Sequence, residues 1–490
     1  MMKPIVLILM LILISRVASA QDELEHLSPY ATGAGRTYAI SARGLDAVGL
    51  NPSLLALGTP QPFEITIAPI SSLGINAGPS LKQINSISNG FQDTALSSQA
   101  PSTNGLTKGD STRESIANLI GGNNLSSTLA VRVFGMSYFN PDVGGFALTW
   151  TMHAAIEASV PDALLNYIGV NALSKIIQGN QLVPQQVNVQ ALWYSEYTLS
   201  YARTVIGVPS SSDLQLLGGV GFKYITGIAA MEMSPGEFSI NYPQSTLSTS
   251  QYRVGADYLI RSAYPNEFNF NSLPSSFSLN LLANAAAGSG VGADIGITLG
   301  IFDSLHNSPW ELAVSVSDIG SIQWNKNVSL RSVNTVLNQS TTADAGNKDT
   351  LNNQLKALGG TLDTNAGSFT TPLPTTLHIA GAMDFSEIGL TFDGVKLGMA
   401  AEYALGLINT VGAPTNGRFG FAITMEHPSA AFSLHTAIGM TTQDGMTDLT
   451  FAIGFGIANS ILIDAGTDGL NGLFANNGRT DAVVGLKILF

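Results

Sequence analysis

The sequence lacks cysteine, and its 490 residues carry little charge. Without cysteine the chain can form no disulfide and carry no bacterial lipoprotein anchor. Lys, Arg, Asp and Glu make up 11% of the residues, against roughly 25% in an average soluble protein. The formal charge is −13 and no basic stripe is visible, so a nucleic-acid-binding surface is excluded.

Long hydrophobic runs and catalytic motifs are also missing. After residue 20 no apolar run reaches the roughly 20 residues of a membrane-spanning helix. The motifs HExxH, GxxxxGK[ST] and GxSxG do not occur, and the Gly-rich stretch 288–292 opens a strand rather than a βαβ unit. We therefore predict no enzymatic activity and no cofactor.

A metal site is not predicted either, although two sets of residues were candidates. Three histidines on polar strand faces could point to one lumen: His153, His378 and His435. A Gly-rich acidic stretch could bind calcium weakly: Asp464, Asp468, Asn471 and Asp481. A solvated loop is the simpler interpretation of this stretch.

The first twenty residues predict export. Lys3 precedes the apolar run 5–14, and small residues at Ala18, Ser19 and Ala20 suit a signal-peptidase site before Gln21. We expect residues 1–20 to be a cleaved signal peptide, with the mature protein in the bacterial outer membrane.

The stretch 146–160 (FALTWTMHAAIEASV) shows the pattern that recurs along the chain. Phe146, Leu148 and every second residue after them are apolar, whereas the residues between them are small or polar, including His153 and Glu157. Successive side chains of a strand point to opposite faces, so this pattern predicts a long strand with one hydrophobic face.

Fifteen segments alternate in this way, which predicts a transmembrane antiparallel β-barrel with lipid outside and a lumen inside. They begin near residues 63, 129, 145, 187, 216, 251, 277, 291, 310, 377, 395, 418, 430, 448 and 481. Bacterial single-chain barrels have an even number of strands, and the segment at 277 alternates least, so we expect about 14 strands.

Isolated charges lie on the predicted lumen faces: Glu157, Glu196, Arg253, Asp257, Arg261, Asp294, Glu402, Arg418 and Glu426. One interpretation is a structural network that tethers something inside the barrel. The other is a site for a substrate headgroup that involves Arg253, Arg261 or Arg418.

The C-terminal segment DAVVGLKILF alternates up to its last residue, Phe490. A final strand that ends in Phe resembles the assembly signal of bacterial outer-membrane barrels. The barrel-assembly machinery and outer-membrane lipid are therefore the expected partners.

Three intervals within the barrel region 63–490 do not alternate. Residues 78–126 are rich in Ser, Asn and Gly, with a short helix expected at 111–120. Residues 161–182 have the spacing of an amphipathic helix, and residues 332–372 contain a leucine pattern that suggests another. Long insertions usually lie on the extracellular side, but the side of 332–372 depends on the strand count.

Residues 21–62 are too long for a simple leader and are rich in small residues, among them Gly33 and Gly35. A disordered tail is one interpretation. The segment also ends in Asn51-Pro52-Ser53 just before the first strand, and this resembles the N-terminal hatch of the FadL superfamily, in which the usual third residue is Ala. The resemblance implies a hatch folded into the lumen of a barrel of about fourteen strands.

The rest of the chain resembles the FadL- and PorV-like branch, most clearly in GADIGITLG and WELAVSVSDIGSIQW, which include Asp294, Asp318, Gly320 and Trp324. FadL-like members imply uptake of small hydrophobic molecules. PorV-like members imply an accessory role in the secretion or surface attachment of proteins, so the partner would be either a hydrophobic small molecule or a secreted protein. An apolar cavity that reaches the wall would favour transport.

Overall fold

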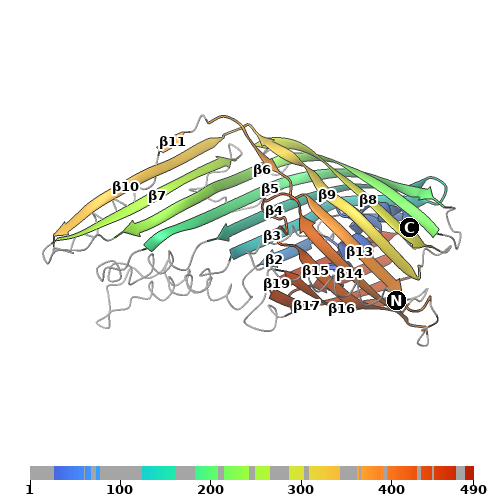
Figure 1. Cartoon of the computed structure of the whole chain (residues 1–490). Coiled ribbons are helices and arrows are strands. Elements are labelled where there is room, and N and C mark those ends of the chain that lie inside the picture. The colour runs from blue at the N-terminus through green and yellow to red at the C-terminus, as the bar shows by residue number, and fades with distance from the viewer. Residues whose placement is uncertain are drawn as a thin grey trace, which may run out of the picture.

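The computed structural model forms a closed antiparallel barrel from which a sheet of longer strands projects at one end (Figure 1). Almost all of its regular structure is β. The structure describes residues 27–59, 61–67, 73–77, 124–159, 182–207, 214–241, 249–264, 286–302, 308–342, 361–363, 366–387, 389, 394–427, 432–443, 446–458, 460–470 and 480–490.

The first half of the chain forms long strands after a short broken one. These strands are β1 (Phe63–Ile67), β2 (Leu73–Ala77), β3 (Asn124–Asn140), β4 (Gly144–Ser159), β5 (Leu182–Ile206), β6 (Leu214–Asn241), β7 (Thr249–Ala263), β8 (Gly288–Ile301), β9 (Trp310–Trp324) and β10 (Ser329–Thr342).

The second half forms shorter strands, and the first two of them are fragments of only three and four residues. These strands are β11 (Thr361–Asp363), β12 (Phe369–Pro372), β13 (Thr376–Asp384), β14 (Lys396–Gly406), β15 (Arg418–His427), β16 (Phe432–Gln443), β17 (Met446–Ile457), β18 (Ile461–Thr467) and β19 (Thr480–Leu489).

The barrel closes between its first and last strands. Both β1 and β2 pair with β3 on one side and with β19 on the other, so together they act as one interrupted strand. Likewise β12 and β13 both pair with β9. Counted in this way the closed ring has 14 strands, which confirms the predicted number. Closure leaves no ring strand with an unpaired edge in the lipid.

The membership of the ring differs from the prediction at two strands. The segment near residue 251 forms β7, which pairs with the far part of β6 and with β10 in the projecting sheet, not in the ring. The ring instead contains β18, which was overlooked because its seven residues contain Gly and Asp. The expected strand near 277 lies outside the described residues.

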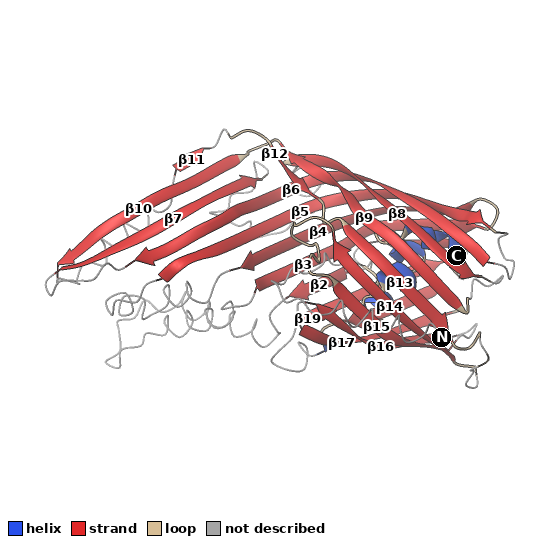
Figure 2. Cartoon of the chain, in the orientation of Figure 1, coloured by secondary structure: helices blue, strands red, loops and turns tan. Residues whose placement is uncertain are grey.

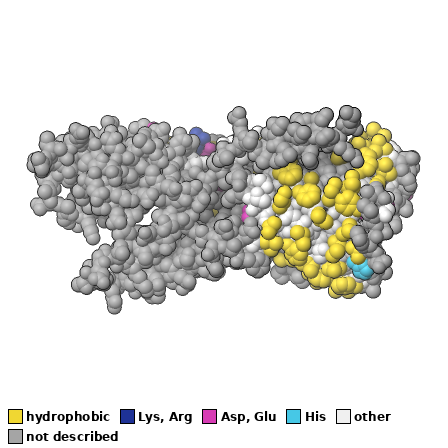
Figure 3. All heavy atoms as spheres, turned by 60° about the horizontal axis from the view of Figure 1, so that its bottom comes forward, with side chains coloured by type: hydrophobic (Ala, Val, Ile, Leu, Met, Phe, Trp, Pro, Cys, Tyr) yellow, Lys and Arg dark blue, Asp and Glu magenta, His cyan; other side chains and the backbone are white. Residues whose placement is uncertain are grey.

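The alternation of 146–160 has the predicted orientation. Phe146, Leu148 and Ile156 are exposed on the outside, whereas Thr149, Glu157 and the other residues of that face are buried inside. In Figure 3 hydrophobic side chains dominate the described part of the barrel surface. An apolar outer surface on a closed barrel is the arrangement of an outer-membrane β-barrel.

Exposed aromatic residues gather at the end of the barrel where the chain enters β1 and leaves β19. They are Tyr138, Phe146, Phe432, Phe455 and Phe490. The backbone N–H of Phe490 donates to the carbonyl of Phe63 (2.9 Å), so the final residue closes the ring at this end. Aromatic girdles mark membrane interfaces, and we call this end the terminal end and the opposite one the loop end.

The strand directions place each insertion. The strands that flank 78–126, 161–182 and 332–372 all reach the loop end. Residues 124–126 belong to β3, and the described parts of 332–372 form β10, β11 and β12. The three expected helices fall outside the described residues.

Four short helices precede the barrel and lie inside it (Figure 2). They are α2 (Pro29–Gly33), α3 (Tyr38–Ser41), η1 (Gly44–Ala47) and η2 (Pro52–Leu57). In the part of the chain that the structure describes, none of the helices has the length and apolar character needed to cross a membrane.

Candidate functional site

Residues 27–59, which we call the N-terminal segment, pass around the inside of the barrel. Helix α2 packs against β16–β19, α3 against β9, β13 and β14, η1 against β3 and β4, and η2 against β3–β6 and β8. Almost all of its side chains are buried. The segment therefore lies against the wall on every side of the lumen.

The Asn51-Pro52-Ser53 motif starts η2 and fixes it to the wall. Asn51 is the N-cap, and its side-chain oxygen accepts from the backbone N–H of Ser53 (3.2 Å), with Pro52 in the first turn. The Asn51 amide donates to the carbonyl of Ala39 (2.8 Å) and to the hydroxyl of Thr298 on β8 (3.1 Å). The Ser53 hydroxyl donates to Asn51 (2.6 Å), a bond that an alanine at this position could not form.

Glycines on both sides allow the segment and the wall to approach closely. Gly35 has a φ of +70°, and a Cβ on Gly33 would lie 2.2 Å from the Phe451 carbonyl oxygen. On the wall, a Cβ on Gly420 would lie 1.7 Å from the Gly35 oxygen, and one on Gly466 would lie 1.8 Å from the Pro29 oxygen. The small residues of both surfaces thus form a backbone-to-backbone contact.

Arg36 forms the first ionic tether. Its guanidinium pairs with Asp468, just after β18, and with Asp481 on β19, and all three side chains are fully buried. The backbone carbonyl of Arg36 accepts a hydrogen bond from Arg418 on β15 (2.7 Å). The segment is thereby joined to two parts of the wall at one residue.

Asp46 forms the second tether, on η1. Its carboxylate pairs with Arg132 of β3 (3.0 Å) and Lys487 of β19 (2.5 Å). Beside it, Glu64 of β1 accepts from the backbone N–H of Leu45 (2.9 Å). The two cations offset the free-energy cost of burying this carboxylate, whereas a buried carboxylate without a cation would be strongly destabilising.

Glu402 of β14 forms the third tether. One of its oxygens accepts from the backbone N–H of Ala39 (2.7 Å), and the other contacts His378 Nδ1 (2.9 Å) and Arg418 Nη2 (3.1 Å). The Arg418 guanidinium also stands 5.4 Å from the ring centre of Tyr38. Two of the predicted lumen charges, Glu402 and Arg418, therefore meet each other and the segment.

Lys223 of β6 is the centre of an acidic cluster in the wall. Its ammonium lies 2.6 Å from Asp318, 3.0 Å from Asp294 and 3.5 Å from Glu196, on β9, β8 and β5. Asp318 has a φ of +57° at a break in the β8–β9 register, and its N–H donates to Asp294 (2.9 Å). The predicted charges Glu196 and Asp294 thus share one cation.

The other predicted lumen charges are not brought into these tethers. Glu157 is buried on the inner face of β4, and Glu426 is exposed where β15 reaches the terminal end. Asp257 and Arg261 are exposed on β7, and Arg253 belongs to the same strand. β7 belongs to the projecting sheet and not to the ring, so the assignment of these three charges to the lumen stays a prediction.

The three histidines contact different partners. His153 stacks on Tyr194 with ring centres 5.0 Å apart, His378 contacts Glu402, and His435 Nε2 lies 2.7 Å from Asp464. Among the described residues no group of three or more His, Asp or Glu side chains is arranged to hold a metal ion.

The predicted acidic stretch is split, because Asp464 pairs with His435 and Asp468 pairs with Arg36. Asn471 lies outside the described residues.

Tyr30 of α2 contacts the His435 ring edge-on, with centres 5.0 Å apart. Burial raises the pKa of its hydroxyl to about 12, so the group stays neutral at any physiological pH.

Sequence reasoning missed several of the buried charges. Arg36 and Asp46 lie in no motif, and Arg132 and Lys223 are isolated charges on strands β3 and β6. Lys487 could have been found, because it shares the inner face of the last strand with Asp481.

An apolar layer lies above the Lys223 cluster, towards the loop end. It contains residues of β4, β5, β6, β7, β9 and β12 and four residues from the connections between strands. The layer consists of Ala155, Leu192, Tyr194, Ile225, Ala230, Ala263, Ala287, Ile322, Trp324, Val328, Phe369, Leu373 and Val411.

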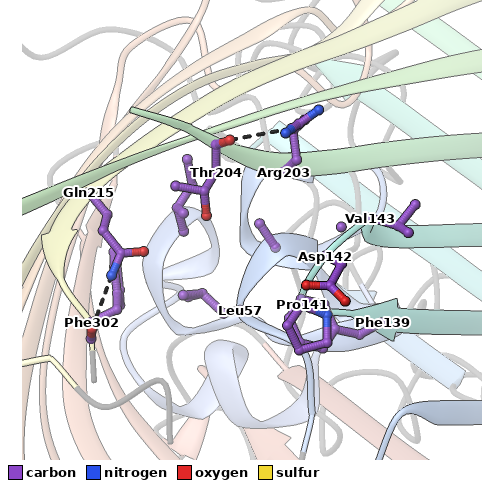
Figure 4. Close-up of a pocket in the computed structure, with 12 residues that line it drawn as sticks. Leu57, Phe139, Pro141, Asp142, Val143, Arg203, Thr204, Gln215 and Phe302 are labelled. Atoms are coloured by element: carbon purple, nitrogen blue, oxygen red, sulfur yellow. Dashed lines mark hydrogen bonds between the residues drawn. The ribbon is translucent and has the colours of Figure 1, made fainter. Parts of the chain in front are cut away.

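Two small pockets border the segment. One, of about 40 Å³, lies at the terminal end between the end of η2 (Ala56 and Leu57), the β3–β4 turn and the ends of β5, β6 and β8 (Figure 4). At its edge Gln215 donates to the carbonyl of Phe302 (3.0 Å). The other, of about 30 Å³, lies between the segment, Arg132 and the Lys223 cluster. Either can hold water, but ligand pockets usually have about 300–1,000 Å³.

A family described as a family of unknown function (DUF5723) matches residues 56–457. No curated protein matches the sequence. Among solved structures, a deltaS2S3 mutant of the monoaromatic hydrocarbon channel TodX has 9% identity and a TM-score of 0.43, covering 93% of this chain and 99% of that one.

Two further similar structures are more distant. The toluene transporter TodX of Pseudomonas putida has 8% identity and a TM-score of 0.37, covering 96% of this chain and 100% of that one. A Pseudomonas aeruginosa FadL homologue has 10% identity and a TM-score of 0.29, covering 96% and 99%. Likeness at this level extends neither to a ligand nor to a mechanism. Membership of a PorV-like branch stays a prediction.

Proposed function

This chain belongs to the family of unknown function DUF5723, and we propose that it is a bacterial outer-membrane channel that admits small hydrophobic molecules. The N-terminal segment is its hatch. The proposal concerns the chemical class of the solute and leaves its identity open.

The observation that carries the proposal is the composition of the interior. A porin for polar solutes has a water-filled lumen. Here the segment contacts the wall on every side, and the two pockets beside it hold only about 40 and 30 Å³. The apolar layer at the loop end offers Leu192, Trp324 and Phe369 to a solute instead of water. Such an interior favours a solute that exchanges apolar contacts with the wall.

The ionic tethers support the role of the segment as a hatch. Arg36, Asp46 and Glu402 join it to the wall through buried charges, whereas a plain leader would need no such partners. Because these bonds hold the segment in one place, passage needs a local rearrangement of its contacts.

Uptake by whole cells tests the proposal. A strain without the gene should take up at least one compound more slowly, from a panel that spans monoaromatic hydrocarbons and long-chain fatty acids, and the intact gene should restore the rate. Uptake of a polar sugar serves as the control and should not change. Unchanged uptake of the whole panel, with loss of surface proteins, would favour a PorV-like secretion accessory instead.

A further inference from the structure

The loop that joins β14 to β15, residues 407–417, folds into the barrel. Leu407 at its start is 52% exposed, but Val411 at its tip is 3% exposed and Ala413 is fully buried. A loop at the rim of a barrel normally extends into water, because its backbone polar groups need partners. This one finds its partners inside.

The tip of the loop reaches a strand on the far side of the ring. The backbone N–H of Val411 donates to the side-chain oxygen of Gln190 on β5 (2.9 Å). The ring places β6, β8, β9 and β13 between β5 and β14. The Val411 side chain belongs to the apolar layer, which is built by residues of β5, β6 and β9 among others. The loop therefore crosses the lumen at the loop end, directly over that layer.

The loop keeps its shape through its own hydrogen bonds. Ala413 N–H donates to the carbonyl of Thr410 (3.1 Å), and Gly406 N–H donates to that of Pro414 (3.0 Å). Gly412 and Gly417 have φ values of +86° and +78°, which favour glycine and turn the chain at both places. These bonds and turns make residues 407–417 one compactly folded unit between β14 and β15.

We propose that loop 407–417 is a gate at the loop end, a second barrier in series with the N-terminal segment. It closes by placing Val411 in the apolar layer and opens when Val411 leaves Gln190. The proposal differs from the hatch in place and in chemistry. The hatch is held by buried ion pairs, whereas the described contacts at the tip of the gate are a neutral hydrogen bond to Gln190 and the buried Val411 side chain. A hydrophobic solute can replace that valine in the layer.

A reversible cross-link tests whether the loop must move. Because the chain has no native cysteine, Gln190→Cys and Val411→Cys can be joined by a bis-methanethiosulfonate and released by a reductant. Thr442→Cys with Thr447→Cys is the matched control. These exposed residues face each other at the loop end (hydroxyl oxygens 3.2 Å apart) within one hairpin, so the cross-link leaves loop 407–417 free.

Trp324 reports access to the apolar layer, because its side chain is fully buried there. Replacing Trp150, Trp193 and Trp310 with Phe leaves it as the only tryptophan. In detergent, acrylamide should quench Trp324 several-fold less in the cross-linked 190–411 pair than after reduction, and equally in both states of the control pair. Equal quenching of the 190–411 pair in both states would overturn the proposal. Fluorescence of added 1-N-phenylnaphthylamine repeats the measurement with all tryptophans present.

The same variants separate the gate from the proposed transport. If the cross-link blocks access to Trp324 while deletion of the gene changes no uptake, the gate stands and the transport function fails. If uptake depends on the gene but is equal with and without the cross-link, transport stands and the gate fails.

Discussion

Replacing Arg36 with Met should release the N-terminal segment while the barrel stays folded. Arg36, Asp468 and Asp481 are fully buried, so the change leaves two carboxylates without their cation. Removing one partner of a buried ion pair costs about 3–5 kcal/mol. Since about 1.4 kcal/mol changes an equilibrium constant tenfold, the fraction of molecules with a displaced segment should rise roughly 10²- to 10⁴-fold.

Proteinase K cleavage within residues 27–59 measures that fraction, because cleavage follows the population of the open form when opening is fast. Migration in unheated and boiled gels checks that the barrel remains closed. Arg43→Met is the matched control. Its side chain is 36% exposed in the pair with Glu311, and such pairs contribute about 0–1 kcal/mol, so cleavage should rise less than about tenfold. Equal cleavage of Arg36→Met and the native protein would refute the tether. Adding Asp468→Asn and Asp481→Asn should restore part of the protection.

Three further predictions concern the wall, the hatch contact and processing. Ile438→Arg, at the outer face in the middle of β16, should cost about 2–4 kcal/mol and lower the folding yield in lipid vesicles, whereas Ile438→Leu should not. Gly420→Ala should raise cleavage of residues 27–59, because its Cβ needs the space of the Gly35 oxygen. Gly381→Ala should leave cleavage unchanged, since the nearest atom is 3.2 Å away at the tip of Leu312, and equal effects would contradict the close contact. The intact mass of the mature protein should begin at Gln21, and a mass that includes Met1 would reject the signal peptide.

The barrel was predictable because lipid and lumen impose opposite demands on alternate residues of each strand. Alternation alone does not distinguish the strands of the ring from other strands that have one apolar and one polar face. β7 alternates as well as any barrel strand, yet it pairs beyond the ring, and β18 is so short that Gly466 and Asp464 hide its pattern. The correct total of fourteen therefore includes one wrong strand and lacks one right strand.

The partners of the buried charges were beyond sequence reasoning for a different reason. Arg36 meets Asp481 at a separation of 445 residues, and Asp46 meets Lys487 at 441. Such pairs arise only when the last strand closes on the first and the segment enters the lumen. Lumen-facing position was predictable at Glu196 and Glu402. The partner of each was not, because no local pattern records which strand stands opposite.

The distribution of tethers limits how the proposed channel can open. Arg36, Asp46 and Ala39 hold the middle of the segment through buried charges, and breaking two such contacts together costs about 6–10 kcal/mol. That leaves fewer than roughly one molecule in 10⁴ with the middle withdrawn, which is too few for a channel that works by expelling its hatch.

η2 is held differently, by neutral hydrogen bonds of Asn51 and Ser53 and by leucine packing, and it borders the pocket at the terminal end. Each neutral hydrogen bond contributes only about 0.5–1.5 kcal/mol. In the proposed channel, the passage at the terminal end therefore opens along η2, while the ionic middle of the segment stays in place.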